Sequence, residues 1–346
     1  MDGYLKIINP ITFKGWDDLV TSSGRLAPFL SSSWARVFFE TYNYRPYYFC
    51  LINEGLLEGL VPLIEVDSSI TGKRAVSLPF TDYCNPLIDN TAQFKEFFRD
   101  IVSFGKANNW EYIEFRGGEE FLDGEEVSSA YHLHEIEISE DEKINRKLLR
   151  DSTRRNIDKA IKSNLIIRKS TDLSDVKTFY SMHKKTRKAH GLPPQPFKFF
   201  ENIHKHIIDK GDGVVFLAEH QNEIVAGAIF LSFGDQAIYK YGASANDTNK
   251  IRPNNLIMWE AIKWCSENGL RSLNLGRTDL NSEGLLQYKR GWGGKESLLN
   301  YYRFDMKSES FVADNSGRNS RLEKVFQLTP MPILTKFGEI TYRHFG

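Results

Sequence analysis

The chain has 346 residues, with 45 basic and 45 acidic side chains that cancel to a formal net charge of zero. Zero net charge excludes an overall bias toward polyanions, and aromatic residues at 13% argue against a disordered chain. The length exceeds one ordinary core and predicts about two domains.

Cysteine usage and the N-terminal sequence predict a cytoplasmic protein. Cys50, Cys84 and Cys265 are widely spaced and form no CxxC pair, which fits a reducing compartment. The first residues lack the basic and apolar stretches of a signal peptide, and no apolar run is long enough to span a bilayer. Histidines and cysteines show no ligand spacing typical of a metal site, so neither a metal nor a tightly bound cofactor is predicted.

The first half of the chain predicts a strand pair, a helix and a further strand. Residues 48–63 show two apolar strands joined by a tight Glu-Gly turn. Residues 94–105 place apolar side chains at helical spacing, and an Asn-Asn stop precedes an alternating strand over 110–116. A proline-bounded loop between these elements, residues 78–89, carries Asp82 and Tyr83; since any turn needs polar residues, these are weak signals taken alone.

Charges separate sharply after the first half. Residues 119–142 hold ten acidic residues and no Lys or Arg, whereas residues 143–169 hold ten Lys or Arg and two Asp. We expect one helix over 145–162, with Ser152 or Thr153 as its N-cap. Either this helix is a solvated face paired with the acidic strip, or it contacts phosphates. In the second case the residues on one side are Arg154, Arg155 and Lys159.

A second amphipathic helix begins near residue 178 and breaks at Gly191, before three prolines. It is either a surface helix with a rigid loop or one wall of a ligand site. The polar and aromatic residues that recur at helical spacing toward the break are Tyr180, His183, Thr186, Arg187 and His190.

The second half then repeats the layout of the first. Residues 215–231 again show two apolar strands with a polar turn, about 165 positions after the first pair. A helix over 256–265 stops at Asn-Gly and precedes a strand over 270–277 that ends in Arg277. The same elements in the same order predict two α/β domains of similar fold, each a mixed sheet with flanking helices. In the second half, the strand 238–245 lies between the strand pair and the helix. Its alternation predicts Tyr239 and Tyr241 on one face and Lys240 on the other.

Residues 281–295 are the richest candidate for chemistry. Glycines and aromatics surround Lys289 and Arg290, and we expect a constrained loop that displays these cations to a phosphate or a developing oxyanion. A hairpin turn with solvated charges would show the same composition.

The segments Tyr239-x-Tyr-Gly-Ala-Ser, Leu275-Gly-Arg and Leu285-x-x-Tyr-Lys-x-Gly-Trp-Gly resemble the FemA/FemB/FemX family. Phe179-Tyr-x-Met-x-x-x-x-Arg and Arg154-Arg-Asn-Ile-x-Lys-Ala are similar to its landmarks as well. The resemblance covers roughly residues 30–305 and implies two tandem GNAT-like domains. These would span 1–142, completed by 309–346, and 143–308.

The resemblance also implies an activity. Family members transfer an amino acid from aminoacyl-tRNA to an amine of a peptidoglycan precursor. By this resemblance Lys289 lies at the reacting ester, Arg187 contacts precursor phosphates, and Asp82 or Asp89 falls near a cleft aspartate. The positions expected to bind substrate are Arg187, Tyr239, Tyr241, Arg277, Arg290, Tyr83 and Arg36.

The donor stays open between aminoacyl-tRNA and acyl-CoA. Standard CoA sites hold the pyrophosphate on a glycine-rich loop at a helix N-terminus. The equivalent connection, residues 246–255, has no glycine, and Pro253 removes a backbone donor. This favours aminoacyl-tRNA, with an acyl-CoA-dependent N-acyltransferase and a non-catalytic glycan- or RNA-binding protein as the alternatives. The envelope precursor and tRNA are the expected partners, with peripheral membrane association a further one and no DNA.

Overall fold

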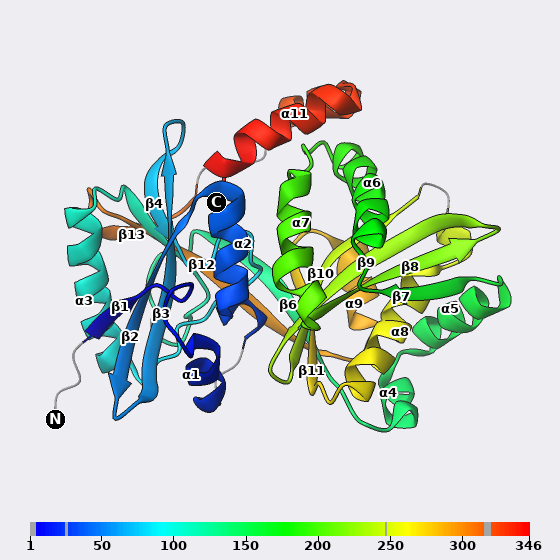
Figure 1. The fold of residues 1–346 in the computed structure, drawn as a ribbon, viewed down its shortest axis with the longest axis horizontal. Coiled ribbons are helices and arrows are strands. Elements are labelled where there is room, and N and C mark those ends of the chain that lie inside the picture. The colour runs from blue at the N-terminus through cyan, green and yellow to red at the C-terminus, as the bar shows by residue number, and fades with distance from the viewer. Residues whose placement is uncertain (1–4, 25–26, 246–247, 315–319) are drawn as a thin grey trace. The chain divides into compact units, whose positions relative to one another are not determined.

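The computed structural model describes residues 5–24, 27–245, 248–314 and 320–346, which fall into two compact units (Figure 1). The first unit comprises Met1–His132, Leu298–Arg318 and Thr341–Gly346, and the second comprises Leu133–Ser297 and Asn319–Ile340. These bounds differ from the expected 1–142 and 143–308. Residues 298–308 join the first unit through strand pairing, and most of the expected tail, 319–340, joins the second.

The first unit is a sheet with strand order β1-β2-β3-β4-β5-β12, and β13 pairs with β12. Its pairs are antiparallel except β4 with β5. Its strands are β1 Leu5–Ile8, β2 Arg45–Asn53, β3 Leu56–Ser68, β4 Gly72–Val76, β5 Tyr112–Arg116, β12 Lys295–Asp305 and β13 Ser310–Val312. Its helices are α1 Trp16–Ser22, η1 Pro28–Leu30, α2 Ser32–Tyr42, α3 Thr91–Ala107 and η4 Tyr342–His344.

The second unit is a sheet with strand order β6-β11-β10-β9-β8-β7. Its strands are β6 Ser129–Glu137, β7 Ile166–Ser170, β8 Gly213–His220, β9 Glu223–Phe233, β10 Gln236–Ser244 and β11 Ser272–Asp279. Its helices are α4 Glu142–Leu148, α5 Asp151–Lys162, α6 Leu173–Ala189, α7 Phe197–His206, η2 Ile208–Lys210, η3 Thr248–Lys250, α8 Pro253–Glu267, α9 Glu283–Arg290, α10 Ser320–Leu328 and α11 Met331–Thr341.

The predicted repeat is confirmed in both order and pairing. In the first unit β2, β3 and β4 pair antiparallel, α3 follows, and β5 returns parallel to β4. In the second unit β8, β9, β10, α8 and β11 do the same. Both hairpin turns place consecutive residues at positive φ, Glu54-Gly55 and Gln221-Asn222, as two-residue turns between twisted strands require.

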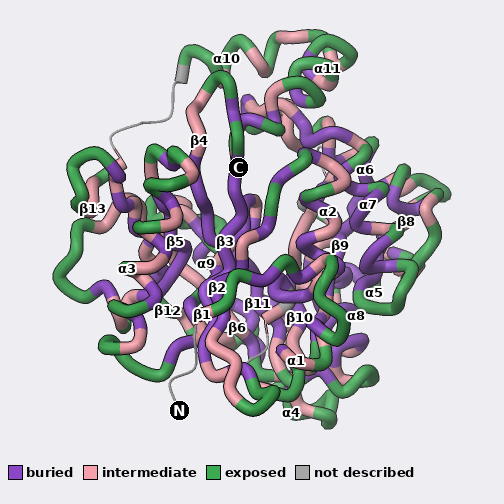
Figure 2. The backbone as a smooth tube through the Cα atoms, turned by 60° about the vertical axis from the view of Figure 1, so that its left-hand side comes forward, coloured by how far each residue is buried: buried purple, intermediate pink, exposed green. Residues whose placement is uncertain are grey.

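Each unit has its own apolar core, seen as buried stretches of the strands and facing helices in Figure 2. The first core packs α3, through Phe94, Phe97 and Ile101, against β2, β3 and β5. The second core packs α5 and α8 against the sheet, with Trp259 and Trp292 among its buried side chains. None of the described helices has the length and apolarity needed to cross a bilayer.

The basic segment is two helices rather than one, because α4 ends at Leu148 and α5 begins at Asp151. Leu149 is buried in the core, and the Arg150 amide donates to the carbonyl of Gly291 at 3.0 Å. Arg150 is the N-cap of α5 with an extended backbone and no side-chain cap, so the predicted Ser152 or Thr153 cap is wrong. Tertiary contacts to Gly291 and the core set this break.

Candidate active site

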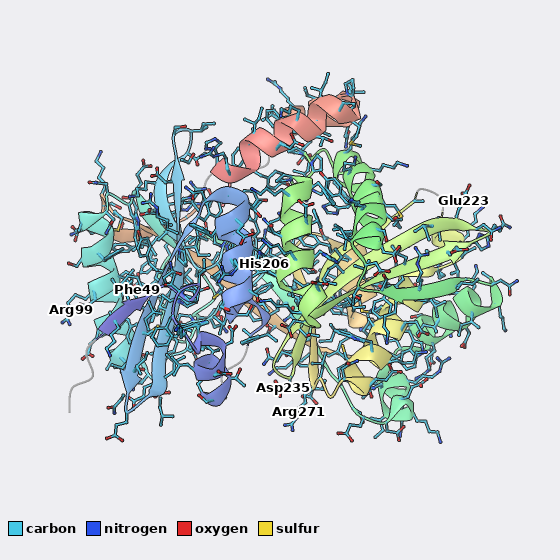
Figure 3. All side chains as sticks on the ribbon, in the orientation of Figure 1. Phe49, Arg99, His206, Glu223, Asp235 and Arg271 are labelled. Atoms are coloured by element: carbon cyan, nitrogen blue, oxygen red, sulfur yellow. The ribbon has the colours of Figure 1, made fainter. Side chains whose placement is uncertain are left out.

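The second unit has a divergence between two parallel strands. β10 and β11 pair at Gln236–Ser272, Ala237–Leu273 and Ile238–Asn274. Asp235 and Arg271 lie where the two strands begin, and the Arg271 amide donates to the Asp235 carbonyl at 2.7 Å (Figure 3). Past Ile238 the described residues of β10 continue their pairing with β9, on its other side. Where the two strands diverge, their facing backbone N–H and C=O groups must take hydrogen-bond partners from side chains or a ligand.

A β-bulge lies at the start of the divergence. Tyr239 pairs with Phe230 and Tyr241 with Ile229, so Lys240 is the extra residue. Tyr239 consequently packs against the α5–α8 core, its ring 5.3 Å from that of Phe230, whereas Tyr241 lies on the α6–α7 side. The prediction that both tyrosines share one face is wrong, because an inserted residue shifts the alternation by one.

Lys289 points inward from a helix. Residues 283–290 form α9 and not the expected constrained loop, and Lys289 in its last turn is 3% exposed. Its ammonium donates to the carbonyl of Gly276 at 2.7 Å and to that of Arg277 at 3.1 Å. Both acceptors are on the diverging part of β11, so a fixed positive charge is held at this strand.

The same stretch of β11 carries polar groups that the sequence did not single out. Gly276 has φ 72°, which favours glycine, and its amide donates to the side chain of Asn274 at 2.7 Å. The Nδ2 of Asn274 and the Oγ1 of Thr278 are buried without a hydrogen-bond partner. Asn274 lies between the core residues Leu273 and Leu275, so its side chain is on the opposite face of the strand. Only burial and backbone geometry mark Asn274, Gly276 and Thr278; their residue types gave no signal.

An aromatic cluster surrounds His183 on α6. Its ring lies 5.1 Å from Phe200, 5.5 Å from Tyr241 and 5.7 Å from Phe179. Burial, with a smaller contribution from Arg187, lowers the pKa of His183 to about 3. The imidazole is therefore neutral at physiological pH, and both ring nitrogens are buried without a hydrogen-bond partner.

Arg187 lies one turn after His183 and is half-buried. Its Nε donates to the carbonyl of Pro193 at 3.4 Å, in the loop that follows α6. The break predicted at Gly191 is confirmed, since this residue has φ 67° and directly follows the helix cap. The cation therefore lies beside a rigid, proline-bounded loop.

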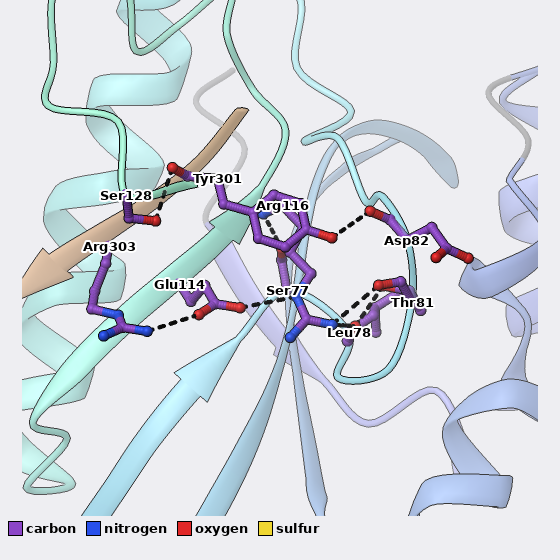
Figure 4. A network of polar contacts seen from close by, with 9 residues as sticks. All are labelled: Ser77, Leu78, Thr81, Asp82, Glu114, Arg116, Ser128, Tyr301 and Arg303. Carbon is purple, nitrogen blue, oxygen red and sulfur yellow. Dashed lines mark hydrogen bonds and ion pairs between the residues drawn. The ribbon is translucent and has the colours of Figure 1, made fainter. Parts of the chain in front are cut away.

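The first unit fills the equivalent divergence with its own arginine (Figure 4). Arg116 lies two residues beyond the last β4–β5 pair. Gly276 lies at the same distance beyond the last β10–β11 pair of the second unit. Its guanidinium contacts Glu114 at 2.9 Å and donates to the carbonyls of Leu78 and Thr81 at 3.3 and 3.1 Å. Arg116 thus has, in the first unit, the register position that Gly276 has in the second.

The expected residues of the first unit lie around this network or at its edge. The carbonyl of Asp82 accepts from the hydroxyl of Tyr301 at 2.5 Å, and the Asp82 side chain extends away from the network (Figure 4). Tyr83 packs edge-on against Phe29 at 6.1 Å. Arg36 donates to the carbonyl of Ile11 at 3.1 Å, which ties α2 to the N-terminal segment.

The remaining cations of the second unit divide into anchored and exposed ones. Arg154 pairs with Asp151 and donates to the carbonyl of Leu149 at 2.8 Å. Arg290 donates to both carboxylate oxygens of Glu296 at 2.5 and 2.6 Å, and these hydrogen bonds raise the pKa of its guanidinium. Arg155, Lys159 and Arg277 are exposed to solvent, and so is Arg290 although it pairs with Glu296.

Comparison with known proteins agrees with this architecture. The family described as acetyltransferase (GNAT) domain matches residues 147–290. A crystal structure of FemX covers 87% of this chain and 97% of its own, with a TM-score of 0.68 and 16% identity. A tandem GNAT protein from the clavulanic acid biosynthesis pathway covers 88% of this chain and 99% of its own, with a TM-score of 0.54 and 7% identity.

Sequence relatives point to a narrower group. A lipid II:glycine glycyltransferase of Staphylococcus haemolyticus is 37% identical over 98 residues, which are 26% of this chain and 23% of the relative. The Staphylococcus aureus protein of the same description is 30% identical over 82 residues, or 22% and 20% of the two chains. The chain thus matches less than a quarter of the length of these relatives.

The repeated sheets and the matched GNAT segment define a tandem GNAT-fold protein, as the sequence predicted. Within that class, the predicted similarity to the FemA/FemB/FemX family is confirmed by the glycyltransferase relatives and by the FemX fold.

Proposed function

We propose that the protein is an aminoacyltransferase that forms an amide bond on an amine of a peptidoglycan-type precursor. The observation that carries this proposal is the buried Lys289 ammonium, held by two carbonyls of β11 at the divergence from β10. The description of the relatives as lipid II:glycine glycyltransferases supports the same reaction class. The GNAT match at 147–290 includes both Lys289 and Arg187.

The reaction needs a cation where negative charge develops. A neutral amine of the acceptor attacks the ester carbonyl of the donor, the new C–N bond forms, and the ester C–O bond breaks. The amine proton leaves with the released ribose hydroxyl, so no external oxidant or cofactor enters. We assign to Lys289 the stabilisation of the oxyanion, where loss of one such donor typically costs about 2.7–4 kcal/mol of activation free energy.

Arg187 is our candidate for the acceptor's phosphates. A lipid- or nucleotide-linked precursor carries phosphates, and a guanidinium binds these with paired N–H donors. Its hydrogen bond to the Pro193 carbonyl holds the guanidinium beside the Gly191–Pro196 loop. Tyr241, on the same side as the α6 cluster, is the candidate cleft tyrosine, since Tyr239 belongs to the core.

We assign aminoacyl-tRNA as the donor, which places the reaction in the cytoplasm. The connection 246–255 lies partly outside the described residues, but its end is defined: Arg252 has φ 57° and Pro253 is the first residue of α8. Proline at that position removes one of the amides that a pyrophosphate would use. The exposed Arg155 and Lys159, one turn apart on α5, are the remaining candidates for RNA phosphate contacts.

The test is single-turnover transfer from a pool of radiolabelled aminoacyl-tRNAs, beside labelled acetyl-CoA, to nucleotide-linked and lipid-linked muropeptides. We expect amide-linked label from tRNA, reduced about 10²–10³-fold in Lys289→Met. Lys295→Met, which removes an exposed lysine nearby, is the matched control.

Each other outcome selects a different reading. Label from acetyl-CoA alone would identify an N-acyltransferase with an unusual CoA site. Acceptor binding without transfer from either donor would identify a non-catalytic precursor-binding protein. Full turnover by a folded Lys289→Met protein would refute the assigned role of the lysine.

A further inference from the structure

Helices α10 and α11 form a hairpin with an apolar outer face. Large apolar side chains recur at spacings of three and four residues and are exposed on both helices. They are Leu322 at 51%, Val325 at 56%, Leu328 at 85%, Ile333 at 61%, Phe337 at 41% and Ile340 at 55%. Exposed residues recur along this hairpin in Figure 2. Large apolar side chains exposed together on one element are typical of an interaction surface.

The inner face of the hairpin packs against the loop that follows α6 in the same unit. Leu334 is fully buried, and a Cβ added to Gly338 would lie 2.1 Å from the carbonyl oxygen of Pro194. Gln327 donates to the carbonyl of Ala189 at 3.0 Å. The rings of Phe326 and Phe337 contact each other at 5.2 Å and join the two helices. The apolar side chains are therefore displayed by a packed element.

The hairpin carries one more basic side chain than acidic ones, and Arg321 and Lys324 place that excess on α10. Residues 320–341 contain three basic side chains, Arg321, Lys324 and Lys336, and two acidic ones, Glu323 and Glu339. The backbone and Cβ of Glu323 lie within 2.8 Å of where a Gly191 Cβ would be, and Glu339 pairs with Lys336 at 3.2 Å. Basic side chains beside an exposed apolar stripe are the pattern of helices that lie in a membrane interface.

The hairpin also adjoins the proposed acceptor site. Within the second unit it contacts Ala189, Gly191 and Pro194, and Arg187 donates to Pro193 in that same loop. A lipid-linked acceptor would present its phosphates at the membrane surface, next to its lipid anchor. A surface that docks on lipid beside Arg187 would therefore bring this cation to the level of those phosphates.

We propose that the outer face of α10 and α11 docks on an anionic lipid surface and so presents the Arg187 loop to a membrane-anchored acceptor. The lipid contact rests on the exposed side chains and their charges, and the orientation of the acceptor rests on the proposed function. The occupant is the headgroup and upper acyl region of the bilayer, into which the six apolar side chains insert.

The test is co-sedimentation of the full chain with phosphatidylcholine vesicles, with and without phosphatidylglycerol. We expect the wild type to bind the mixed vesicles, and Leu328→Glu/Ile333→Glu to bind at least tenfold more weakly. Ile166→Glu is the matched control, because Ile166 is 63% exposed on β7 of the same unit. Lys324→Glu should weaken binding to the mixed vesicles and leave binding to phosphatidylcholine alone unchanged.

Equal vesicle binding by the double variant and the wild type, or no binding by the wild type, would overturn the proposal. A dimer in sedimentation velocity that the double variant dissociates, without vesicle binding, would instead assign this face to a second copy of the chain. Transfer to a water-soluble nucleotide-linked acceptor should be retained by the double variant, and only transfer to the vesicle-borne acceptor should fall. If the wild type transfers to neither acceptor, the proposed function fails, while the vesicle assay still decides the surface.

Discussion

The neutral, buried His183 should make the second unit sensitive to acid, and His183→Leu should remove that sensitivity. Burial, together with the nearby Arg187, lowers the pKa of His183 from 6.5 to about 3 in the folded protein. Between these values the unfolded chain binds a proton that the folded chain excludes. The stabilisation is therefore fully present above pH 6.5 and is lost as the pH falls toward 3.

The magnitude follows from the width of this interval. One pKa unit corresponds to about 1.36 kcal/mol, and pH 4.5 is two units below 6.5, so a fall from pH 7.5 to pH 4.5 removes about 2.7 kcal/mol of unfolding free energy through this group. Leucine is close to histidine in size and suits the surrounding aromatic rings of Phe179, Phe200 and Tyr241. Leucine does not titrate, so the pH-dependent contribution of residue 183 to the unfolding free energy disappears in the variant.

The assay is urea unfolding of both proteins at pH 7.5 and pH 4.5, with hydrogen exchange of α6 and α7 peptides to follow the second unit. The contributions of the titratable groups that both proteins share cancel when the two losses of unfolding free energy between pH 7.5 and pH 4.5 are compared. We expect the wild type to lose about 2.7 kcal/mol more than His183→Leu. His190→Leu, at an exposed site that caps the same helix, should behave as the wild type. Parallel losses in the wild type and His183→Leu would refute the reasoning.

Two further substitutions test the packing described above. Arg116→Met should destabilise the first unit by about 3–5 kcal/mol, because it leaves Glu114 buried after loss of its closest cation; denaturant unfolding measures this, and a loss under about 1 kcal/mol would contradict it. Gly338→Ala should cost about 1–3 kcal/mol and increase hydrogen exchange in α11, since its Cβ meets the Pro194 carbonyl. Gly284→Ala in α9 has no atom within 4 Å of the new Cβ and should be neutral or stabilising; equal effects of the two alanines would rule out the steric explanation.

Local patterns in the sequence were sufficient for the elements and their repetition. The hairpins, α3, α8 and their Asn-containing stops were predicted because turn residues and apolar periodicity act over a few positions. The break after α6 followed from Gly191 and the prolines. These signals depend on the neighbouring residues alone, so two α/β repeats could be inferred without a structure.

Tertiary structure decided where the candidate residues point and which unit the late strands join. A single inserted residue in β10 separates Tyr239 from Tyr241, and the strand pattern carries no trace of it. Helix α9 turns Lys289 inward to the carbonyls of Gly276 and Arg277, although the glycines around it predicted a constrained loop that displays the cation. β12 pairs with β5, so it completes the first unit from a distant part of the chain. Strand pairing and the satisfaction of buried polar groups depend on residues far apart in sequence, and no local pattern encodes them.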